Sequence, residues 1–253
     1  MTDRPIISVI TVVLNDRQHI ESTIKSVLHQ TYPHIEYIII DGGSTDGTCE
    51  IIENYAGKIS AFVSGSDDGI YDAMNKGLTI ATGNYVLFLN SGDMLYENDT
   101  VKRIFSLGEA DIYFGDTAFY DQQGKFIGLR SKISTRALPE KLTYRNFLMG
   151  MPVSHQAFIV KKELAPEFDN SYNCSADADW CIKCLKSGRI VTNTRLVISR
   201  YLVGGHSHRH PVKCWVERFK ISIIHFGLIL TLFSQIRIFI RYLYKRIFLK
   251  RKF

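Results

Sequence analysis

The chain has 253 residues, enough for one α/β domain with a sizeable core and at most an appendage. Its composition, 45% hydrophobic and 22% charged, is ordinary for a globular protein, and the absence of repeats and low-complexity linkers excludes a repeat architecture. The net charge of +6 is uneven: residues 213–253 carry ten Lys and Arg against one Glu, which leaves residues 1–212 at −3. This asymmetry predicts an anionic partner for the tail, either a membrane or a nucleic acid.

The N-terminal residues Met1 to Pro5 lack the apolar segment of a signal peptide, so we expect a cytoplasmic protein. Of the five cysteines, Cys181 and Cys184 form a C-x-x-C pair on a predicted helix, but no second pair completes the four ligands of a structural zinc site. We therefore expect reduced thiols, with metal or redox use of the pair as the alternative.

The first 93 residues alternate between buried strands and helices. A β-branched run predicts the first strand over 6–13, and Asp16 is placed to cap a helix that extends to about Gln30. Further strands are predicted over 37–40, 59–64 and 85–89, and the helices between them over 44–55 and 70–81. This order predicts a parallel sheet with right-handed crossovers.

After Asp93 the pattern is less regular. A helix is predicted over 174–186, and short strands over 111–116, 117–120, 126–129, 155–160, 190–192 and 197–202. The one boundary in composition lies near residue 212. We therefore expect a domain over 1–212, divided into halves 1–93 and 94–212, and a separate tail over 213–253.

Acidic residues follow three successive predicted strands: Asp41, the pair Asp67 and Asp68, and Asp93. The carboxyl ends of parallel strands meet at one edge of a sheet, so these acids are expected to converge. Glycines follow Asp41 and a helix then begins, which allows close backbone approach and favours negative charge. Asp41 could accept a hydrogen bond from a nucleobase imide or a ribose; alternatively, the segment is a plain turn with a helix cap.

Asp93 ends the sequence Asn90-Ser91-Gly92-Asp93 after a buried strand. A carboxylate there could bind Mg²⁺ or Mn²⁺, hard ions that prefer oxygen ligands and often share them with substrate phosphates. The alternative is an ordinary turn residue.

Asp177 and Asp179 lie near the start of a predicted helix, where one of them could be a general base for an acceptor hydroxyl. The alternative is that both are first-turn acids behind a Ser175 cap. Residues 204–210 form a segment rich in Gly, His and Arg, with His206, His208 and His210. This segment could close over a diphosphate or supply a metal ligand. The alternative is a solvated loop.

The tail combines an apolar and an amphipathic segment. Residues 221–233 are mostly apolar but too short for the about 20 residues that span a bilayer. From Gln235 on, apolar residues recur at helical spacing, with Arg237, Arg241 and Lys245 on another face; they are Ile236, Phe239, Ile240, Leu243 and Ile247. The pattern is typical of an amphipathic helix on an anionic membrane surface, with a core helix and a solvated basic end as the alternative. Nucleic acid is not expected as a partner.

Together, these motifs resemble the family 2 glycosyltransferases with the GT-A fold over residues 6 to about 205. The opening strand, the turn after Asp41, the segment Asp67–Gly77 and the position of the metal-binding DXD motif at 90–93 occur in the family's order, followed by acceptor-side motifs at 154–157 and 175–177. Residues 67–77 are similar to a subgroup of bacterial exopolysaccharide enzymes of the colanic acid type. The implied fold class is α/β, a Rossmann-like and mostly parallel GT-A sheet flanked by helices, here followed by the basic amphipathic helical tail.

The resemblance implies an inverting, metal-dependent sugar transfer. Asp93 would hold Mn²⁺ or Mg²⁺, Asp177 would be the catalytic base, and Asp179 is its rival. His206 is an additional metal candidate, because Gly92 stands where the motif often has a second acid. The implied nucleotide-sugar contacts are Thr11, Asn15, Asp41, Ser44, Asp67, Asn75 and Lys76, and the implied acceptor or diphosphate contacts are His155 and Gln156.

We therefore expect a peripheral enzyme on the inner face of a bacterial cell membrane. Its donor would be a UDP-, GDP- or dTDP-linked sugar, and its acceptor a lipid-linked saccharide of surface polysaccharide synthesis. Residues 213–253 would contact the anionic membrane. The alternatives are a non-catalytic nucleotide-sugar-binding protein and a peripheral membrane scaffold.

Overall fold

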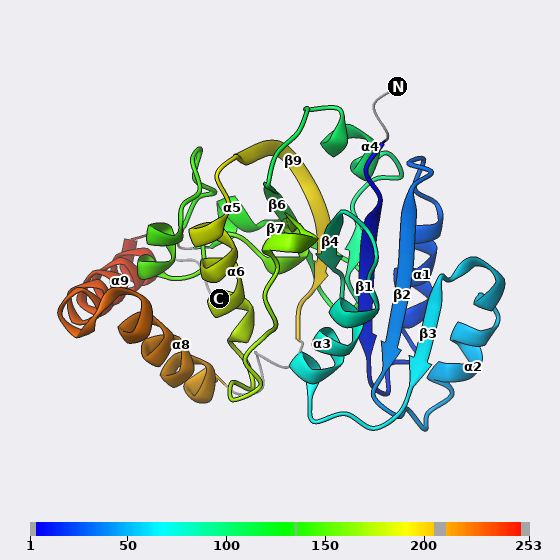
Figure 1. Ribbon diagram of the computed structural model, residues 1–253. Helices are drawn as coiled ribbons and strands as arrows, with labels where there is room; N and C mark the ends of the chain where they lie inside the picture. The colour runs from blue at the N-terminus through cyan, green and yellow to red at the C-terminus, as the bar shows by residue number, and fades with distance from the viewer. Residues whose placement is uncertain (1–3, 135, 205–210, 249–253) are drawn as a thin grey trace.

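A computed structural model describes residues 4–134, 136–204 and 211–248 (Figure 1). Its strands are β1 (Ile7–Val13), β2 (Ile35–Asp41), β3 (Ala61–Ser64), β4 (Tyr85–Phe88), β5 (Met94–Leu95), β6 (Ile112–Tyr120), β7 (Phe126–Leu129), β8 (Phe158–Lys161) and β9 (Val191–Leu202). Its α-helices are α1 (Ile20–Leu28), α2 (Thr48–Glu53), α3 (Ile70–Ile80), α4 (Thr100–Phe105), α5 (Arg130–Ile133), α6 (Ala176–Ser187), α8 (Pro211–Phe226) and α9 (Leu228–Phe248). Two short 3₁₀ helices, η2 (Tyr144–Met149) and η3 (His155–Ala157), lie near the site described below.

The N-terminal half is a parallel sheet in the order β3-β2-β1-β4, as the alternation of strands and helices predicts. All seven residues of β1 are buried, because helices cover both faces of the sheet, with α3 in front and α1 behind (Figure 1). Gly77 allows α3 to approach closely, since a Cβ at this position would lie 2.4 Å from Ile10 Cγ2.

Beyond β4 the sheet becomes mixed, with strand order β4-β8-β6-β9-β5. The β4–β8, β8–β6 and β9–β5 pairs are antiparallel, whereas β6 and β9 run parallel. The expectation of a mostly parallel sheet therefore holds for the first half only. The hairpin that joins β6 directly to β7 adds a fourth antiparallel pair beside them.

Several predicted boundaries differ from the structure. The segments predicted over 111–116 and 117–120 are one strand, β6, which begins at Ile112. Those predicted over 190–192 and 197–202 are also one strand, β9, which begins at Val191. The helix expected from residue 44 begins at Thr48, because the preceding turn is held by the Asp41 carboxylate instead. Asp16 does not cap α1 with its side chain, which bonds to Ser91 and His19.

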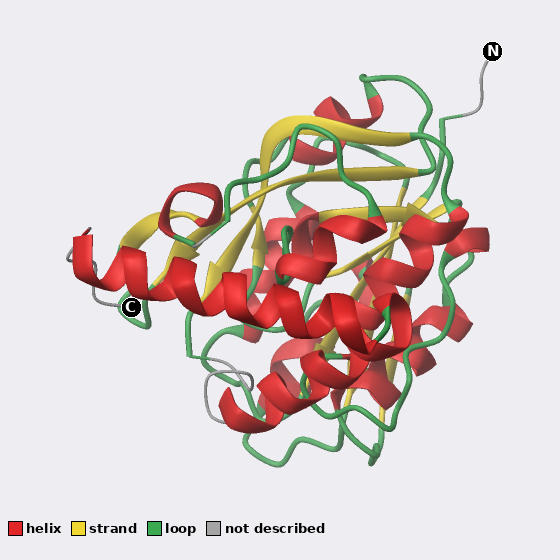
Figure 2. Cartoon of the chain, turned by 90° about the vertical axis from the view of Figure 1, so that its left-hand side faces the viewer, coloured by secondary structure: helices red, strands yellow, loops and turns green. Residues whose placement is uncertain are grey.

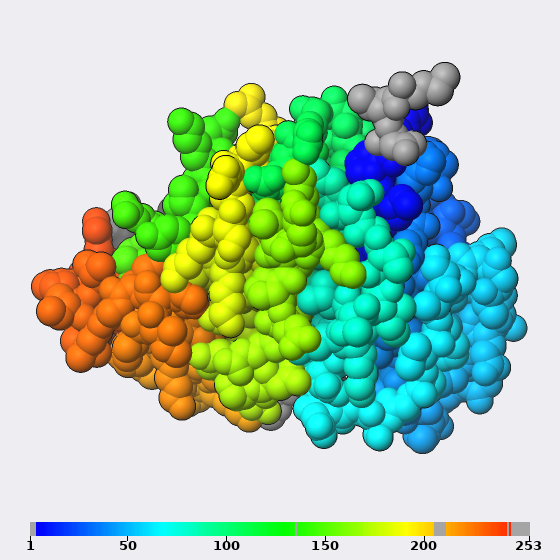
Figure 3. Space-filling model, viewed as in Figure 1, coloured from blue at the N-terminus to red at the C-terminus, as the bar shows by residue number. Residues whose placement is uncertain are grey.

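The tail forms two helices that meet at Gly227, whose φ of +82° suits glycine. The longer helix, α9, crosses the face shown in Figure 2 with α8 below it. Trp215 Nε1 donates to Gln235 Oε1 at 3.3 Å, so α9 folds back along α8. In the space-filling view both helices form a lobe on the side away from β2 and β3 (Figure 3). None of the helices in the described part of the chain is both long and apolar enough to cross a bilayer.

The expected division at residue 212 falls inside α8, and α8 is fastened to the rest of the domain. Glu217 is only 7% exposed, and its two carboxylate oxygens accept hydrogen bonds of 2.9 Å from the N–H groups of Asn173 and Cys174. His225, near the other end of α8, contacts Asp179 of α6. Residues 211–226 are therefore packed as part of the domain rather than as a free tail.

Candidate active site

The candidate site lies at the edge where β1, β2 and β3 end, which is the lower edge of the sheet in Figure 1. Asp41 is the last residue of β2, and residues 90–93 follow β4. Since the parallel register aligns these ends, polar side chains from distant segments are brought together there.

The Asp41 carboxylate holds the turn after β2. Its Oδ2 accepts hydrogen bonds from the N–H groups of Gly43 (3.0 Å) and Ser44 (2.9 Å) and from Ser64 Oγ (2.7 Å). Burial by itself would raise the pKa of Asp41, but hydrogen bonds from Ser44, Ser64 and Cys49 outweigh it and hold the pKa below its usual value. The other oxygen, Oδ1, is buried without a hydrogen-bond partner in the described structure. An ionised carboxylate with one unpaired oxygen is suited to accept a hydrogen bond from a ligand.

Asn15 and Asp67 complete this corner of the site. Asn15 adopts a positive φ of 50°, donates its backbone N–H to Ser44 Oγ (2.7 Å) and accepts from Thr45 N–H (2.9 Å) through Oδ1. The Asp67 carboxylate lies against the same turn, because a Cβ on Gly42 would be 2.5 Å from Asp67 Oδ2. The structure thus brings together four of the expected nucleotide-sugar residues: Asn15, Asp41, Ser44 and Asp67.

Three other expected nucleotide-sugar residues have structural partners instead. Thr11 is fully buried, and its hydroxyl donates to Leu89 O at 2.8 Å. Asn75 uses both ends of its amide on the backbone of Phe168 (2.7 and 2.9 Å), which ties α3 to the acceptor half. Lys76 pairs with Asp72 at 2.9 Å. The buried Thr11 side chain is not accessible to a ligand, whereas Asn75 and Lys76 stay predictions.

Two separate hydrogen bonds connect the expected metal residue and the expected catalytic base to adjacent residues of one turn, a pair of contacts that we call the Asp93–Asp177 path. Gln156 Nε2 donates to Asp93 Oδ2 at 2.7 Å. The neighbouring residue, His155, places Nδ1 3.1 Å from Asp177 Oδ2. His155 and Gln156 both lie in η3, just before β8, so one turn of the chain contacts Asp93 and Asp177 together.

Asp93 is 4% exposed, and Leu202 N–H donates to its Oδ1 at 3.2 Å. Burial raises the pKa of Asp93 to about 7, although the hydrogen bond from Gln156 and the nearby His155 act in the opposite direction. Asp16 is an additional acid close by, since its Oδ2 accepts from Ser91 Oγ at 2.7 Å. The sequence predicts Asp16 only as a helix cap, so this placement is new.

The described residues contain no group of three or more His, Cys, Asp and Glu side chains arranged to hold a metal ion. They do contain a buried carboxylate, Asp93, and a buried Asn90 Oδ1 without a partner in the described structure, two residues after β4. Mg²⁺ is often bound through one or two carboxylates, with substrate phosphates and water as the other ligands. Asp93 fits that mode. His206, the additional metal candidate, lies outside the described residues.

The two rival bases face different parts of the molecule. Asp177 faces His155 and has a partly accessible side chain (18% exposed). Asp179 is buried between His225 Nε2 (2.6 Å) and Lys183 Nζ (2.7 Å). Burial would raise the pKa of Asp179, but these two partners more than compensate and lower it. Asp177 is therefore the acid that adjoins the Asp93 network, whereas Asp179 joins α6 to α8.

Two further residues next to the site were not expected from the sequence. Burial raises the pKa of the Tyr201 phenol, and the charges of Asp93 and Asp177 raise it further, which places Tyr201 close to both acids. No sequence signal distinguishes Tyr201 from other residues at the end of β9. Glu217 binds the backbone just before α6. The sequence does single this residue out, because Glu217 is the one acid among ten bases in residues 213–253.

The chain is similar to known enzymes over most of its length. A family model described as glycosyl transferase family 2 matches residues 8–165. A PGL/p-HBAD biosynthesis glycosyltransferase of Mycobacterium bovis (strain BCG / Pasteur 1173P2) is 30% identical over 230 residues, which cover 86% of this chain and 85% of the relative. The putative teichuronic acid biosynthesis glycosyltransferase TuaG of Bacillus subtilis (strain 168) is 28% identical over 233 residues, with coverages of 88% and 91%.

Two solved structures illustrate the likeness in fold. S. aureus TarS 1–349 in complex with UDP-GlcNAc matches with a TM-score of 0.68 at 19% identity, covering 87% of this chain and 66% of that chain. The mannosyltransferase PcManGT from Pyrobaculum calidifontis, in complex with GDP-Man and Mn²⁺, matches with a TM-score of 0.63 at 19% identity, with coverages of 88% and 65%. The chain thus spans just under two thirds of the length of these structures, and at such identity the likeness concerns the fold alone. Because the family model covers more than half of the sequence, the chain belongs to glycosyl transferase family 2 and is a glycosyltransferase with the GT-A fold.

Proposed function

We propose that the protein transfers a sugar from a nucleotide-sugar donor to a lipid-linked saccharide, with inversion at the anomeric carbon. One observation carries the proposal: the neighbouring residues His155 and Gln156 bond to Asp177 and Asp93 respectively, so one short turn contacts both acids. The path spans the boundary between the donor edge of the sheet and α6. A base on one side of a reacting sugar and a diphosphate site on the other are what a single displacement needs.

The donor would bind at the corner formed by Asn15, Asp41 and Asp67. The unpaired Asp41 Oδ1 would accept a hydrogen bond from the nucleobase, and Asp67 would contact the base or the ribose. Support comes from related folds, since TarS and PcManGT were solved with UDP-GlcNAc and GDP-Man. For this chain we propose a UDP-, GDP- or dTDP-linked sugar.

In the proposed reaction, the carboxylate of Asp177 takes the proton of the acceptor hydroxyl as its oxygen attacks the anomeric carbon. The bond from that carbon to the diphosphate oxygen breaks in the same step, so no covalent intermediate forms and one base suffices. His155 Nδ1, 3.1 Å away, orients the Asp177 carboxylate. Asp93 would hold Mn²⁺ or Mg²⁺, which when bound stabilises charge on the departing diphosphate.

We also propose that α8 and α9 rest on the inner face of a bacterial cell membrane, where lipid-linked saccharides are accessible. Eight large apolar side chains on these helices are each exposed over about half to three quarters of their surface: Ile224, Leu228, Ile229, Leu230, Phe233, Ile236, Phe239 and Ile240. The exposed Arg237 lies among them. An exposed apolar strip on a helix that also carries an exposed basic residue is typical of a helix that lies in the membrane interface. A scaffold without activity would share this surface, but it would not need the Asp93–Asp177 path.

The test is transfer by purified protein from a panel of nucleotide sugars with Mn²⁺ or Mg²⁺. We expect Asp93→Ala and Asp177→Asn to abolish transfer while circular dichroism shows a folded protein. The matched control is Asp99→Asn, a half-exposed acid outside the site, which should keep full activity. Full activity of both site variants would overturn the proposal, and donor binding without turnover across acceptors would favour a binding protein.

A further inference from the structure

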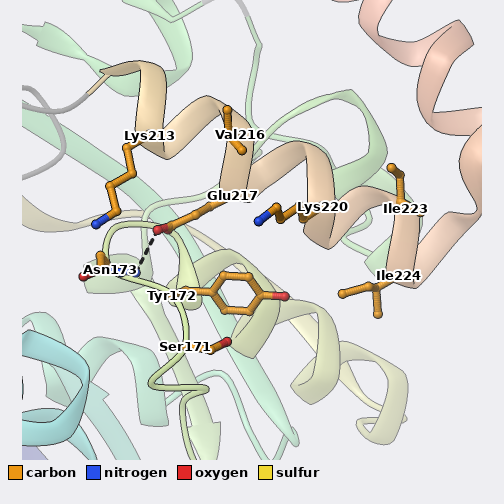
Figure 4. A pocket seen from close by; sticks show the side chains of 9 residues that line it. All are labelled: Ser171, Tyr172, Asn173, Lys213, Val216, Glu217, Lys220, Ile223 and Ile224. Carbon is orange, nitrogen blue, oxygen red and sulfur yellow. Dashed lines mark hydrogen bonds between the residues drawn. The ribbon is translucent and has the colours of Figure 1, made fainter.

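A groove of about 580 Å³ lies on the outer side of α8, against the loop that leads into α6 (Figure 4). It is separate from the donor corner and from the Asp93–Asp177 path. Its lining comes from the loop and from one face of α8: Ser171, Tyr172, Asn173, Lys213, Val216, Glu217, Lys220, Ile223 and Ile224.

One part of the groove is cationic. Lys213 and Lys220 are seven residues apart and therefore share a face of α8, roughly two helical turns from each other. Neither lysine has an ion-pair partner among the described residues. Glu217 lies between them, but both of its carboxylate oxygens are taken by backbone N–H groups, one of which is the dashed bond to Asn173 in Figure 4. The hydrogen bonds orient the Glu217 carboxylate but leave its charge, so two lysines against one glutamate give the groove lining a net charge of +1.

The opposite part of the groove is apolar. Ile223 and Ile224 form its far end in Figure 4, beyond Lys220 and the ring of Tyr172. Ile224 is 67% exposed, and the chain continues after Gly227 into the exposed Leu228 and Ile229. Lysines spread from one end of the groove to its middle, and an apolar other end that leads to the proposed membrane surface, match an amphiphile with an anionic head.

We propose that this groove binds the phosphate and the adjoining hydrocarbon of a single-chain lipid phosphate, the carrier of the acceptor saccharide. The proposal deepens the proposed function and rests on it for the identity of the carrier. The lining loop reaches Asp177 only four residues after Asn173, and Glu217 fixes that stretch of backbone. The phosphate would therefore be held next to the segment that supplies the base. A single chain fits better than a two-chain phospholipid, because the aliphatic lining consists of three side chains from α8 alone, Val216, Ile223 and Ile224.

The test measures binding in solution with the full chain, so that it does not depend on activity or on a membrane. The probe is farnesyl phosphate, and farnesol and inorganic phosphate are its two halves. We expect calorimetry to show tighter binding of farnesyl phosphate than of either half. Lys213→Gln and Lys220→Gln should each weaken binding about fivefold, and together about 30-fold. Ile224→Gln, at an exposed position, should weaken binding of farnesyl phosphate but not of inorganic phosphate.

The matched control is the double variant Lys58→Gln/Lys102→Gln, which removes two exposed lysines far from the groove and should bind as the wild type does. Equal affinity for farnesol and farnesyl phosphate would overturn the proposal, as would equal loss in the control. The proposal would also be overturned if the Lys213→Gln/Lys220→Gln variant still bound farnesyl phosphate as the wild type does but no longer bound phosphatidylglycerol vesicles. The lysines would then bind the bilayer surface rather than a lipid phosphate in the groove. Absence of sugar transfer by the wild-type protein would count against the proposed function but would leave this binding result standing.

Discussion

The side-chain amide of Gln156 donates a 2.7 Å hydrogen bond to Asp93 Oδ2, and this contact joins residues 63 positions apart in the chain. Asp93 follows β4, whereas Gln156 lies in η3, within the acceptor half. The carboxylate is therefore oriented from the opposite half of the domain. Such supporting contacts hold a carboxylate in the geometry that a metal or a diphosphate requires.

Replacing Gln156 by alanine should lower transfer by about 10- to 100-fold, because the Asp93 carboxylate loses its orienting donor. Titration of Mn²⁺ against activity should show the concentration at half-maximal rate rising, with donor binding in the absence of metal unchanged. The exposed Gln123→Ala in the β6–β7 turn is the control. Equal metal dependence in Gln156→Ala and wild type would show that the contact does not support Asp93.

The raised pKa of Asp93 makes a prediction about stability. The folded protein keeps a proton on Asp93 up to about pH 7, whereas the unfolded chain releases it near pH 4. Between these values the folded state binds more protons, so the free energy of unfolding should fall as pH rises. Asp93→Asn removes this term and should be more stable than the wild type by about 2–4 kcal/mol at pH 8, but not at pH 4.

Urea unfolding at several pH values, with metal chelated, measures this difference. Mn²⁺ should restore stability to the wild type but not to Asp93→Asn, since a cation favours the ionised carboxylate. Asp99→Asn should follow the wild type throughout. If Asp93→Asn were no more stable than the wild type at pH 8, the carboxylate would not be strained by burial.

Gly42 offers a test of the donor corner. A Cβ at this position would lie 2.5 Å from Asp67 Oδ2, so Gly42→Ala must displace the Asp67 carboxylate. We expect the KM for the nucleotide sugar to rise about tenfold with little change in kcat, as for the loss of one charge-assisted hydrogen bond. Gly57→Ala is the matched control, because a Cβ there meets nothing within 4 Å. An unchanged donor KM in Gly42→Ala would remove Asp67 from the donor site.

The strand ends could be predicted from the sequence because each is marked locally. Asp41 and Asp93 follow apolar runs, and a parallel sheet brings such ends to one edge. The pairing of Gln156 with Asp93 could not be predicted, since it depends on how β8 docks beside β4 in antiparallel register. Likewise, the family resemblance implies that Thr11 contacts the nucleotide sugar, yet its hydroxyl faces Leu89 and Tyr37 inside the sheet. The boundary at residue 212 is predicted from the change in charge along the sequence. In the structure, Glu217 and His225 bind α8 to the rest of the domain through buried polar contacts, which charge composition does not reveal.

Glu217 is expected to position the segment before Asp177. In Glu217→Gln, one backbone N–H loses its acceptor, at a cost of about 1–3 kcal/mol in unfolding free energy. We expect kcat for a soluble saccharide acceptor to fall and its KM to rise, with the donor KM unchanged, because the donor corner does not contact α8. The exposed Glu163→Gln is the control. A loss of stability without any change in acceptor kinetics would assign Glu217 a structural role only.

The exposed strip of α9 predicts membrane attachment that can be separated from catalysis. Ile236→Glu/Ile240→Glu places two charges at positions that are 57% and 59% exposed, so the fold should tolerate them. Binding to vesicles that contain roughly 30% phosphatidylglycerol should be lost, because the apolar face can no longer enter the interface. Transfer to a soluble acceptor should remain, since neither residue contacts the Asp93–Asp177 path. In the control, Leu107→Glu/Ile190→Glu, two equally exposed apolar residues outside the tail are changed, and vesicle binding should persist. If both double variants lost vesicle binding equally, attachment would depend on net charge rather than on α9.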